Sequence, residues 1–183
     1  LLRGIYAYGF EKPSPIQKKA IVPMIKKKDV IAQAQSGTGK TGCFTIACLE
    51  LIDEKSFDNQ AILLSPTREL SFQIKNVLDN IGINMKNLRT QLLIGGTSTD
   101  KDIRDLRDNC PQILVGCPGR IYDMMRRKHI NCNTIKLLVL DEADEMLSAG
   151  FKDQIYNIFQ YLSKDIQIGL FSATMPPILY NLT

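Results

Sequence analysis

The chain has 183 residues, of which 44% are hydrophobic and 23% charged, with a formal net charge of +4. This size and balance are typical of one ordinary globular domain and exclude a disordered chain or a membrane span. The mild positive charge permits a polyanionic partner without requiring one. The five cysteines form no C-x-x-C pair and there is one histidine, so we expect reduced, buried thiols rather than disulfides or zinc ligands.

Short apolar runs alternate with longer amphipathic segments along the chain. Continuous apolar runs are typical of strands buried on both faces of a parallel sheet. The sequence therefore predicts one α/β domain over residues 1–183, with a twisted parallel sheet and helices on both faces. Expected strands cover residues 29–34, 61–65, 88–94, 112–116, 135–141 and 166–171. Expected helices cover residues 43–54, 68–81, 100–109, 120–128 and 151–162, and the chain opens and stops inside helical patterns.

A glycine-rich loop follows the first expected strand and precedes an apolar helix. Its residues are Ala34, Gln35, Ser36, Gly37, Thr38, Gly39, Lys40 and Thr41. Glycines let consecutive N–H groups point at phosphate oxygens, and the helix N-terminus adds partial positive charge. Lys40 is expected to reach the β- and γ-phosphates of a nucleotide, and the Thr41 hydroxyl to bind Mg²⁺. The alternative is a glycine-rich turn with an accidental lysine; Ala34 replaces the glycine of the general motif.

Two carboxylates, Asp141 and Glu142, come at the end of a buried strand. A carboxylate there can hold Mg²⁺, and its neighbour can orient or deprotonate an attacking water. The simpler alternative is that Asp141 or Asp144 caps the following helix. Because hydrolysis needs both a phosphate cradle and an acidic metal anchor, the phosphate loop upstream favours the metal site.

With these residues in hand, the chain resembles the DEAD-box RNA helicases over its whole length. Seven motifs follow in family order at residues 9–17 (GFEKPSPIQ), 34–41 (AQSGTGKT), 66–70 (PTREL), 95–96 (GG), 117–120 (CPGR), 141–144 (DEAD) and 172–174 (SAT). The resemblance implies a RecA-like domain that binds ATP and Mg²⁺. It also implies that the family's second helicase domain and the aromatic residue that stacks on adenine lie outside this chain, which looks like a fragment that is nearly inactive alone.

The resemblance assigns further nucleotide-site residues. Gln17 looks like the family's adenine reader, since an amide offers both a donor and an acceptor. Lys12 is expected beside the base, or else is a solvated surface lysine. Ser172 and Thr174 are expected to hydrogen-bond with Asp144 and to couple the nucleotide site to RNA, although a polar turn is the simpler interpretation of these residues.

For RNA, the resemblance implies backbone binding by residues that follow three strands. They are Pro66, Thr67, Arg68, Gly95, Gly96, Thr97, Pro118, Gly119 and Arg120. Such contacts position a strand without reading bases, so we expect no sequence preference. From the residues alone, Arg68 and Arg120 are better explained by helix-surface pairing with Glu69 or Asp123. Cys117 stands where the family has threonine, which removes a hydroxyl.

The implied function is an ATP-dependent RNA helicase that unwinds short duplexes locally, acting in translation initiation in the cytoplasm. The sequence around the motifs is most similar to the translation-initiation helicases. The alternative is an ATP-gated RNA clamp of the exon-junction type, which acts in the nucleus. A third possibility is an ATPase that remodels a non-RNA substrate. Expected partners are single-stranded or short-duplex RNA and an activating scaffold protein, with no membrane association and a monomeric state.

Overall fold

The computed structural model describes residues 1–181 and contains one six-stranded sheet in the order β1-β6-β5-β2-β4-β3. Every neighbouring pair of strands is parallel. The strands are β1 (Val30–Gln33), β2 (Ala61–Leu64), β3 (Thr90–Leu93), β4 (Ile113–Gly116), β5 (Leu137–Leu140) and β6 (Gln167–Ser172). The expected parallel α/β fold is confirmed, and each expected strand overlaps an observed one.

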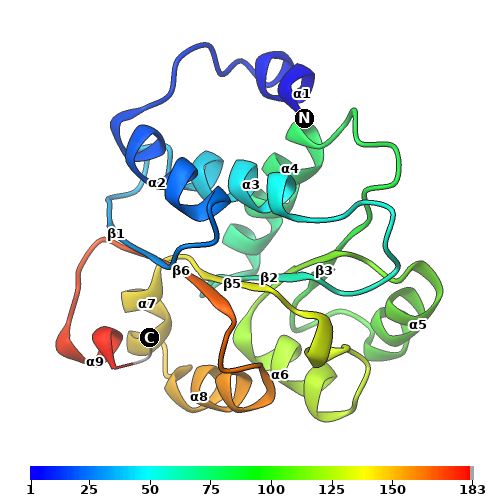
Figure 1. Ribbon diagram of the computed structural model, residues 1–183. Helices are drawn as coiled ribbons and strands as arrows, with labels where there is room; N and C mark the ends of the chain where they lie inside the picture. The colour runs from blue at the N-terminus through cyan, green and yellow to red at the C-terminus, as the bar shows by residue number, and fades with distance from the viewer. Residues whose placement is uncertain (182–183) are drawn as a thin grey trace.

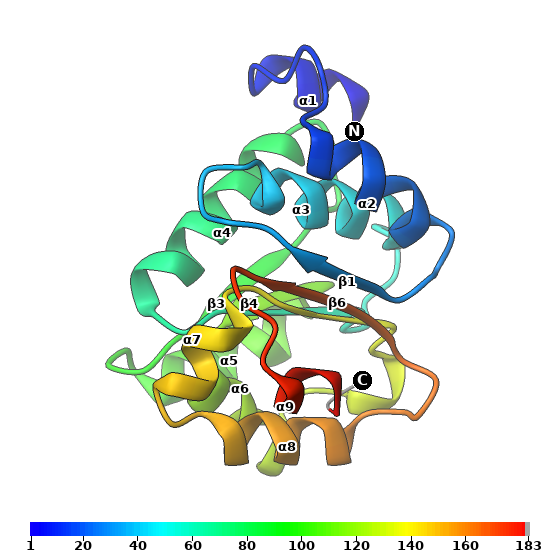
Figure 2. The same cartoon turned by 90° about the vertical axis from the view of Figure 1, so that its left-hand side faces the viewer.

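Helices cover both faces of this sheet (Figures 1 and 2). One face carries α1 (Leu2–Ala7), α2 (Pro15–Ile25), α3 (Lys40–Leu51) and α4 (Arg68–Ile81). The other face carries α5 (Thr99–Asn109), α6 (Pro118–Arg126), α7 (Ala143–Ser148), α8 (Lys152–Tyr161) and α9 (Pro177–Tyr180), and a 3-10 turn, η1 (Cys132–Thr134), precedes β5. The five helices expected from periodicity are all present, with α3 and α6 beginning earlier than expected.

The sheet separates two hydrophobic cores. One core packs Phe44 and Phe171 together, with ring centroids 5.2 Å apart, between α3 and the sheet. The opposite core includes Met124, Met146 and Ile158 from α6, α7 and α8. All four residues of β2, β4 and β5 are buried, which explains why these strands appear in the sequence as unbroken apolar runs.

Three helices that begin in or just after a sequence motif, α2, α4 and α5, have side-chain N-caps. Ser14 and Gln17 form a capping box at the start of α2, in which each side chain bonds the other's backbone N–H. The Thr67 hydroxyl accepts a hydrogen bond from the N–H of Leu70, and Ser98 caps α5 in the same way. Caps of this kind fix where each helix begins, and so they fix the loop in front of it.

All six strands point the same way, so their carboxyl ends form one rim of the sheet. A sequence motif begins at the end of each strand or within two residues of it: residues 34–41 after β1, 66–70 after β2, 95–96 after β3, 117–120 after β4, 141–144 after β5, and 172–174 from the last residue of β6. In open parallel sheets ligands bind at this edge. Within residues 1–181, no helix is long and apolar enough to cross a bilayer.

Candidate nucleotide and RNA site

The phosphate loop owes its shape to two glycines in left-handed backbone conformations. Gly37 has φ of 82° and Gly39 has φ of 90°. A Cβ atom on Gly39 would lie 2.8 Å from both Ser14 Oγ and Gln17 Nε2. Glycine is therefore required at this position for backbone conformation and for space. The loop turns directly into α3, whose first residue is Lys40.

Lys40 is buried, with 4% of its surface exposed, and it faces the two carboxylates that follow β5. Its Nζ lies 2.5 Å from Oε1 of Glu142 and 3.3 Å from Oδ1 of Asp141. Burial alone would lower the pKa of Lys40, but the charges of Asp141 and Glu142 outweigh it and raise that pKa. Burial raises the pKa of Asp141 to about 6, against the opposing charge of Lys40.

A pocket of about 270 Å³ opens beside this cluster. It brings together Lys40, Thr41, Asp141 and Glu142, which the sequence had assigned to catalysis and metal binding, with Ser36, Gly37 and Gly39 of the loop. Tyr8 and Phe10 also line it, with their rings 5.0 Å apart. Neither aromatic residue was assigned to the site from the sequence: Tyr8 precedes the motif at residues 9–17, and Phe10 lies inside it but received no role.

The donor set fits Mg²⁺ together with a triphosphate. Thr41 and Asp141 offer hard oxygen donors in one pocket, and Mg²⁺ in proteins is held by one or two carboxylates while substrate phosphates and water complete its coordination. Among the described residues, no cluster of three or more Asp, Glu, His or Cys could hold a metal ion by itself. This donor set therefore suits a metal that arrives with its nucleotide.

The predicted base-contacting residues lie outside that pocket's lining. The Gln17 amide donates from Nε2 to the Gly39 carbonyl at 3.1 Å, and its Oε1 accepts from the Ser14 N–H at 2.9 Å. Gln17 is buried, whereas Lys12 is exposed. In this structure Gln17 thus connects the start of α2 to the phosphate loop.

Asp144 is held by both polar residues of the last motif. Its N–H donates to Ser172 Oγ at 3.1 Å, and its Oδ2 accepts from Thr174 N–H at 3.1 Å and from Thr174 Oγ1 at 2.7 Å. Burial would raise the pKa of Asp144, but the hydrogen bonds from Thr174 and Ser172 prevail and lower it. The Ser172 carbonyl also accepts from the N–H of Ala34, so one strand end contacts two motifs.

A second pocket, of about 620 Å³, gathers most of the residues assigned to RNA. Its lining includes Pro66, Thr67, Arg68, Gly95, Cys117, Gly119 and Arg120. Gly96, Thr97 and Pro118 are not in its lining. Gly96 and Pro118 are next in sequence to lining residues, and Thr97 is hydrogen-bonded to Arg120, which is one. Phe151, the N-cap residue of α8, also lines this pocket, with Glu69 and Asp123. Phe151 was missed because nothing in its local sequence indicates that α8 starts beneath this pocket.

The arginines do not form the helix-surface pairs that the residues alone favour. Arg120 pairs with Asp102 of α5, while Asp123 pairs with Arg126 and Arg127. Arg68 is exposed and forms no ion pair within residues 1–181. The helix-surface interpretation is therefore wrong for both arginines.

Cys117 also lines this pocket and is buried. Its Sγ is 3.6 Å from Ser71 Oγ, which lies 2.6 Å from Ser65 Oγ. Burial raises the pKa of the Cys117 thiol. The thiol takes part in a buried polar chain, and no side-chain bond caps α6 at this position. The thiols of Cys110 and Cys132 are only partly buried, contrary to expectation.

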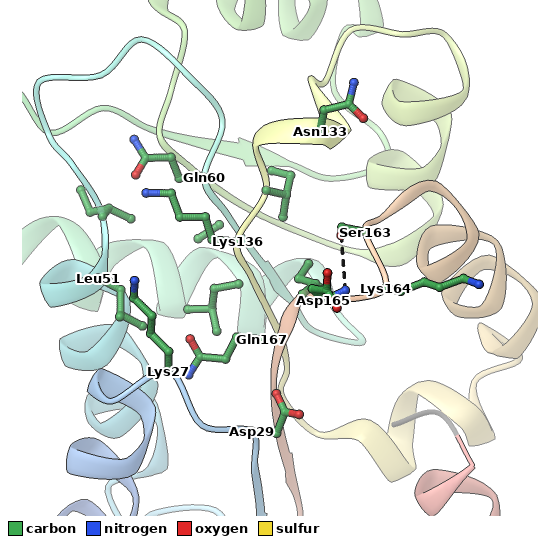
Figure 3. Close-up of a pocket in the computed structure, with 15 residues that line it drawn as sticks. Lys27, Asp29, Leu51, Gln60, Asn133, Lys136, Ser163, Lys164, Asp165 and Gln167 are labelled. Carbon is green, nitrogen blue, oxygen red and sulfur yellow. Dashed lines mark hydrogen bonds between the residues drawn. The ribbon is translucent and has the colours of Figure 1, made fainter.

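A larger hollow, of about 640 Å³, lies at the amino ends of the strands, opposite the rim that carries the motifs (Figure 3). Lys27, Lys136 and Lys164 line it together with Gln60 and Gln167. The buried amides are already used: Gln60 bonds the backbone of Asp53, and Gln167 donates to two backbone carbonyls. The carboxyl ends of α2 and α3 meet there, and lysines complement helix carboxyl ends. Although this hollow is larger, none of the phosphate-loop residues and neither Asp141 nor Glu142 lines it, so it is not the candidate nucleotide site.

A parallel sheet whose first strand ends in a phosphate loop, with paired carboxylates after β5, defines a RecA-like domain of the P-loop class. A model of the DEAD/DEAH box helicase family matches residues 14–182, and the chain belongs to this family. Over 177 residues it is 56% identical to eukaryotic initiation factor 4A of Drosophila melanogaster, an alignment that covers 97% of this chain and 43% of that relative. The chain thus spans less than half the length of this relative.

Solved structures agree with this assignment. A DEAD box protein from the hyperthermophile Methanococcus jannaschii superposes with a TM-score of 0.93 at 41% identity, covering 99% of this chain and 49% of that chain. Dbp5 of S. cerevisiae, in a structure bound to RNA and ADP BeF3, superposes with a TM-score of 0.85 at 38% identity, covering 98% and 45%. The RecA-like fold expected from the family resemblance is confirmed.

Proposed function

We propose that this chain is the ATP-binding part of an ATP-dependent RNA helicase. The observation that carries the proposal is the convergence of Lys40, Asp141 and Glu142 in one pocket. A second pocket, lined by Arg68 and by the loops after β3 and β4, opens at the same rim. Nucleotide chemistry and backbone binding of a polyanion are thereby available side by side.

In this proposal, the loop amides and Lys40 bind the phosphates, and Thr41 and Asp141 hold Mg²⁺. Bound Mg-ATP supplies the phosphoryl group and the metal's positive charge. Glu142 orients water and accepts its proton. Asp144, Ser172 and Thr174 couple this site to RNA, since they link the acidic turn to the end of β6.

RNA is bound through its backbone, without sequence preference, on the surface formed by the residues assigned to it above. Backbone N–H groups at helix starts and the exposed Arg68 side chain bind phosphates irrespective of base. Contacts to ribose 2′-hydroxyls distinguish RNA from DNA. The match of the Dbp5 structure with bound RNA and ADP BeF3 supports this assignment.

The cellular role that we propose is translation initiation, for a monomeric cytoplasmic protein that works with an activating partner. The identity with an initiation factor 4A over 97% of the chain supports this role. RNA-stimulated hydrolysis tests the proposal: steady-state ATPase of the natural full-length protein is measured with poly(U), with poly(A) and with duplex DNA. We expect both RNAs to stimulate hydrolysis and the DNA to leave it unchanged. Equal rates with and without RNA would remove the helicase function and leave only an ATP site.

A further inference from the structure

A buried ion pair joins Arg120, which lines the second pocket, to Asp102, a residue outside every motif. Arg120, at the start of α6, donates from Nη1 to Oδ2 of Asp102 on α5. Their side chains are 10% and 9% exposed. Because removing a charge from water is costly unless it is paired, Arg120 and Asp102 depend on each other.

The same pair holds the loop that follows β3. Arg120 Nη2 donates to the Thr97 carbonyl at 3.0 Å, and Nη1 lies 3.3 Å from Thr97 Oγ1. Thr97 Oγ1 is also 3.4 Å from the Asp102 carboxylate. Gln91 of β3 also donates from its side-chain amide to the Asp102 main-chain carbonyl at 3.0 Å. These bonds connect β3, the loop at residues 95–97 and α5 to the first turn of α6.

The two arginines of the pocket differ in how their charges are used. The Asp102 carboxylate neutralises Arg120, and Arg120 uses both Nη atoms inside the protein. The guanidinium of Arg68 instead lies over Gly96, with Nη1 2.5 Å from the position that a Cβ would occupy. Arg68 is exposed, so its charge is available to a phosphate.

We propose that Asp102 is a positioning residue of the RNA-binding surface, which acts by holding Arg120 against Thr97. Arg120 orders the loop at residues 95–97, and Arg68 supplies the arginine charge that meets phosphate. This inference rests on the proposed RNA-binding function and names the residue that shapes its surface.

The direction in which Asp102→Asn changes RNA affinity distinguishes a positioning role from simple charge neutralisation. If Asp102 only masked Arg120, Asp102→Asn would release a positive charge, tighten RNA binding and steepen its salt dependence. A positioning role predicts about tenfold weaker binding, because an ordered charge-assisted bond to the loop is lost. The salt slope stays that of the wild type, since no phosphate contact is removed.

Fluorescence anisotropy with a labelled oligo(U) RNA, the full-length protein and a non-hydrolysable ATP analogue measures these effects across a salt series. Asp102→Glu keeps the carboxylate and should restore affinity to within about twofold of wild type, while the Asp102→Asn and Arg120→Lys losses should overlap rather than add. Arg68→Ala should lower the salt slope by about one. Asp105→Asn, on the same helix and without a side-chain bond among the described residues, is the matched control. ATP-analogue affinity and thermal unfolding are measured for each variant.

Unchanged or tighter binding by folded Asp102→Asn overturns the inference, as does folded Asp102→Glu that binds as weakly as Asp102→Asn. A salt slope lowered by about one in Arg120→Lys would show direct phosphate contact by Arg120 and also overturn it. If Asp102→Asn does not fold, the decision rests on the Asp102→Glu and Arg120→Lys comparisons. Failure of the wild-type protein to bind RNA instead defeats the proposed function, and the positioning role with it.

Discussion

The Lys40 ammonium nitrogen lies 2.5 Å from Oε1 of Glu142, although 102 residues separate them along the chain. The contact joins the first turn of α3 to the turn after β5. Asp141 lies on the same nitrogen at 3.3 Å. The lysine is therefore part of a buried charge cluster as well as a phosphate-binding group, and its removal has two separable effects.

Lys40→Ala should destabilise the fold as well as abolish nucleotide binding. It leaves two buried carboxylates without their counter-ion, and removing one member of a buried ion pair costs about 3 kcal/mol or more. Urea unfolding at neutral pH measures the loss. Lys28→Ala, an exposed lysine without an ion pair in the described part of the chain, is the control and should change stability little. Equal stabilities of the two variants would contradict the prediction.

Glu142→Gln should keep ATP and RNA binding while lowering the ATPase rate by about 100-fold or more, because general-base catalysis contributes that much. Single-turnover hydrolysis with saturating RNA measures it. A rate near wild type would remove Glu142 from the chemistry. Cellular complementation adds a second readout: a turnover-dependent helicase loses its role with this variant, whereas an ATP-gated clamp retains it.

Thr174→Val should weaken the link between Asp144 and the end of β6 by about 0.5–1 kcal/mol, the net value of a partly exposed hydrogen bond. The folded-state pKa of Asp144 lies below its ordinary value, so its stabilisation is present above the unfolded pKa of about 4. That stabilisation disappears as the pH falls through the folded pKa. Unfolding free energies of wild type and variant should therefore differ at pH 7 and converge at low pH. A difference independent of pH would point to packing instead.

Gly96→Ala should reduce RNA affinity by about tenfold. Its φ of 83° disfavours alanine, and the added Cβ would displace the Arg68 guanidinium, which together cost about 1 kcal/mol or more. Gly119→Ala is the matched comparison, since nothing lies within 4 Å of its added Cβ and alanine keeps the N–H. Anisotropy titrations should separate the two, and similar losses for both would sink this explanation.

Alkylation by iodoacetamide should distinguish the cysteines. Burial raises the pKa of Cys43 and of Cys48 to about 12, so at pH 8 only about one thiol in ten thousand is the reactive thiolate. Cys110 is partly exposed and should be labelled first in the native protein. Mass spectrometry of native and guanidinium-unfolded samples measures this order. Rapid native labelling of Cys48 would show that the α3 core opens readily.

Much of the fold follows from patterns that are local in sequence. The apolar runs at residues 61–65 and 135–141 predict buried parallel strands, and β2 and β5 lie there. The phosphate loop and the acidic pair could be predicted because glycine, lysine and carboxylate at strand ends carry specific chemistry. Parallel strands bring their carboxyl ends to one rim, so convergence of these motifs follows from the topology.

The remaining site residues depend on tertiary placement. Asp102 meets Arg120 because β3 and β4 are neighbours, and no pattern near residue 102 indicates this. Tyr8 and Phe151 reach their pockets through the packing of chain segments that carry no motif at these positions. Helix spacing suggests Asp123 as the partner of Arg120, but Arg120 pairs with Asp102 on another helix. Arg68 forms no ion pair within residues 1–181.

The end of β6 bonds in two directions, through the Ser172 carbonyl to Ala34 and through the Ser172 hydroxyl to Asp144. Side chains alternate faces along a strand, so a shift of one residue would turn this hydroxyl to the other face of the sheet. An insertion inside β6 would therefore disconnect the acidic turn even if the sheet still formed. An insertion among the exposed residues 163–165 would preserve that alignment, so the frame of this strand is constrained by more than packing.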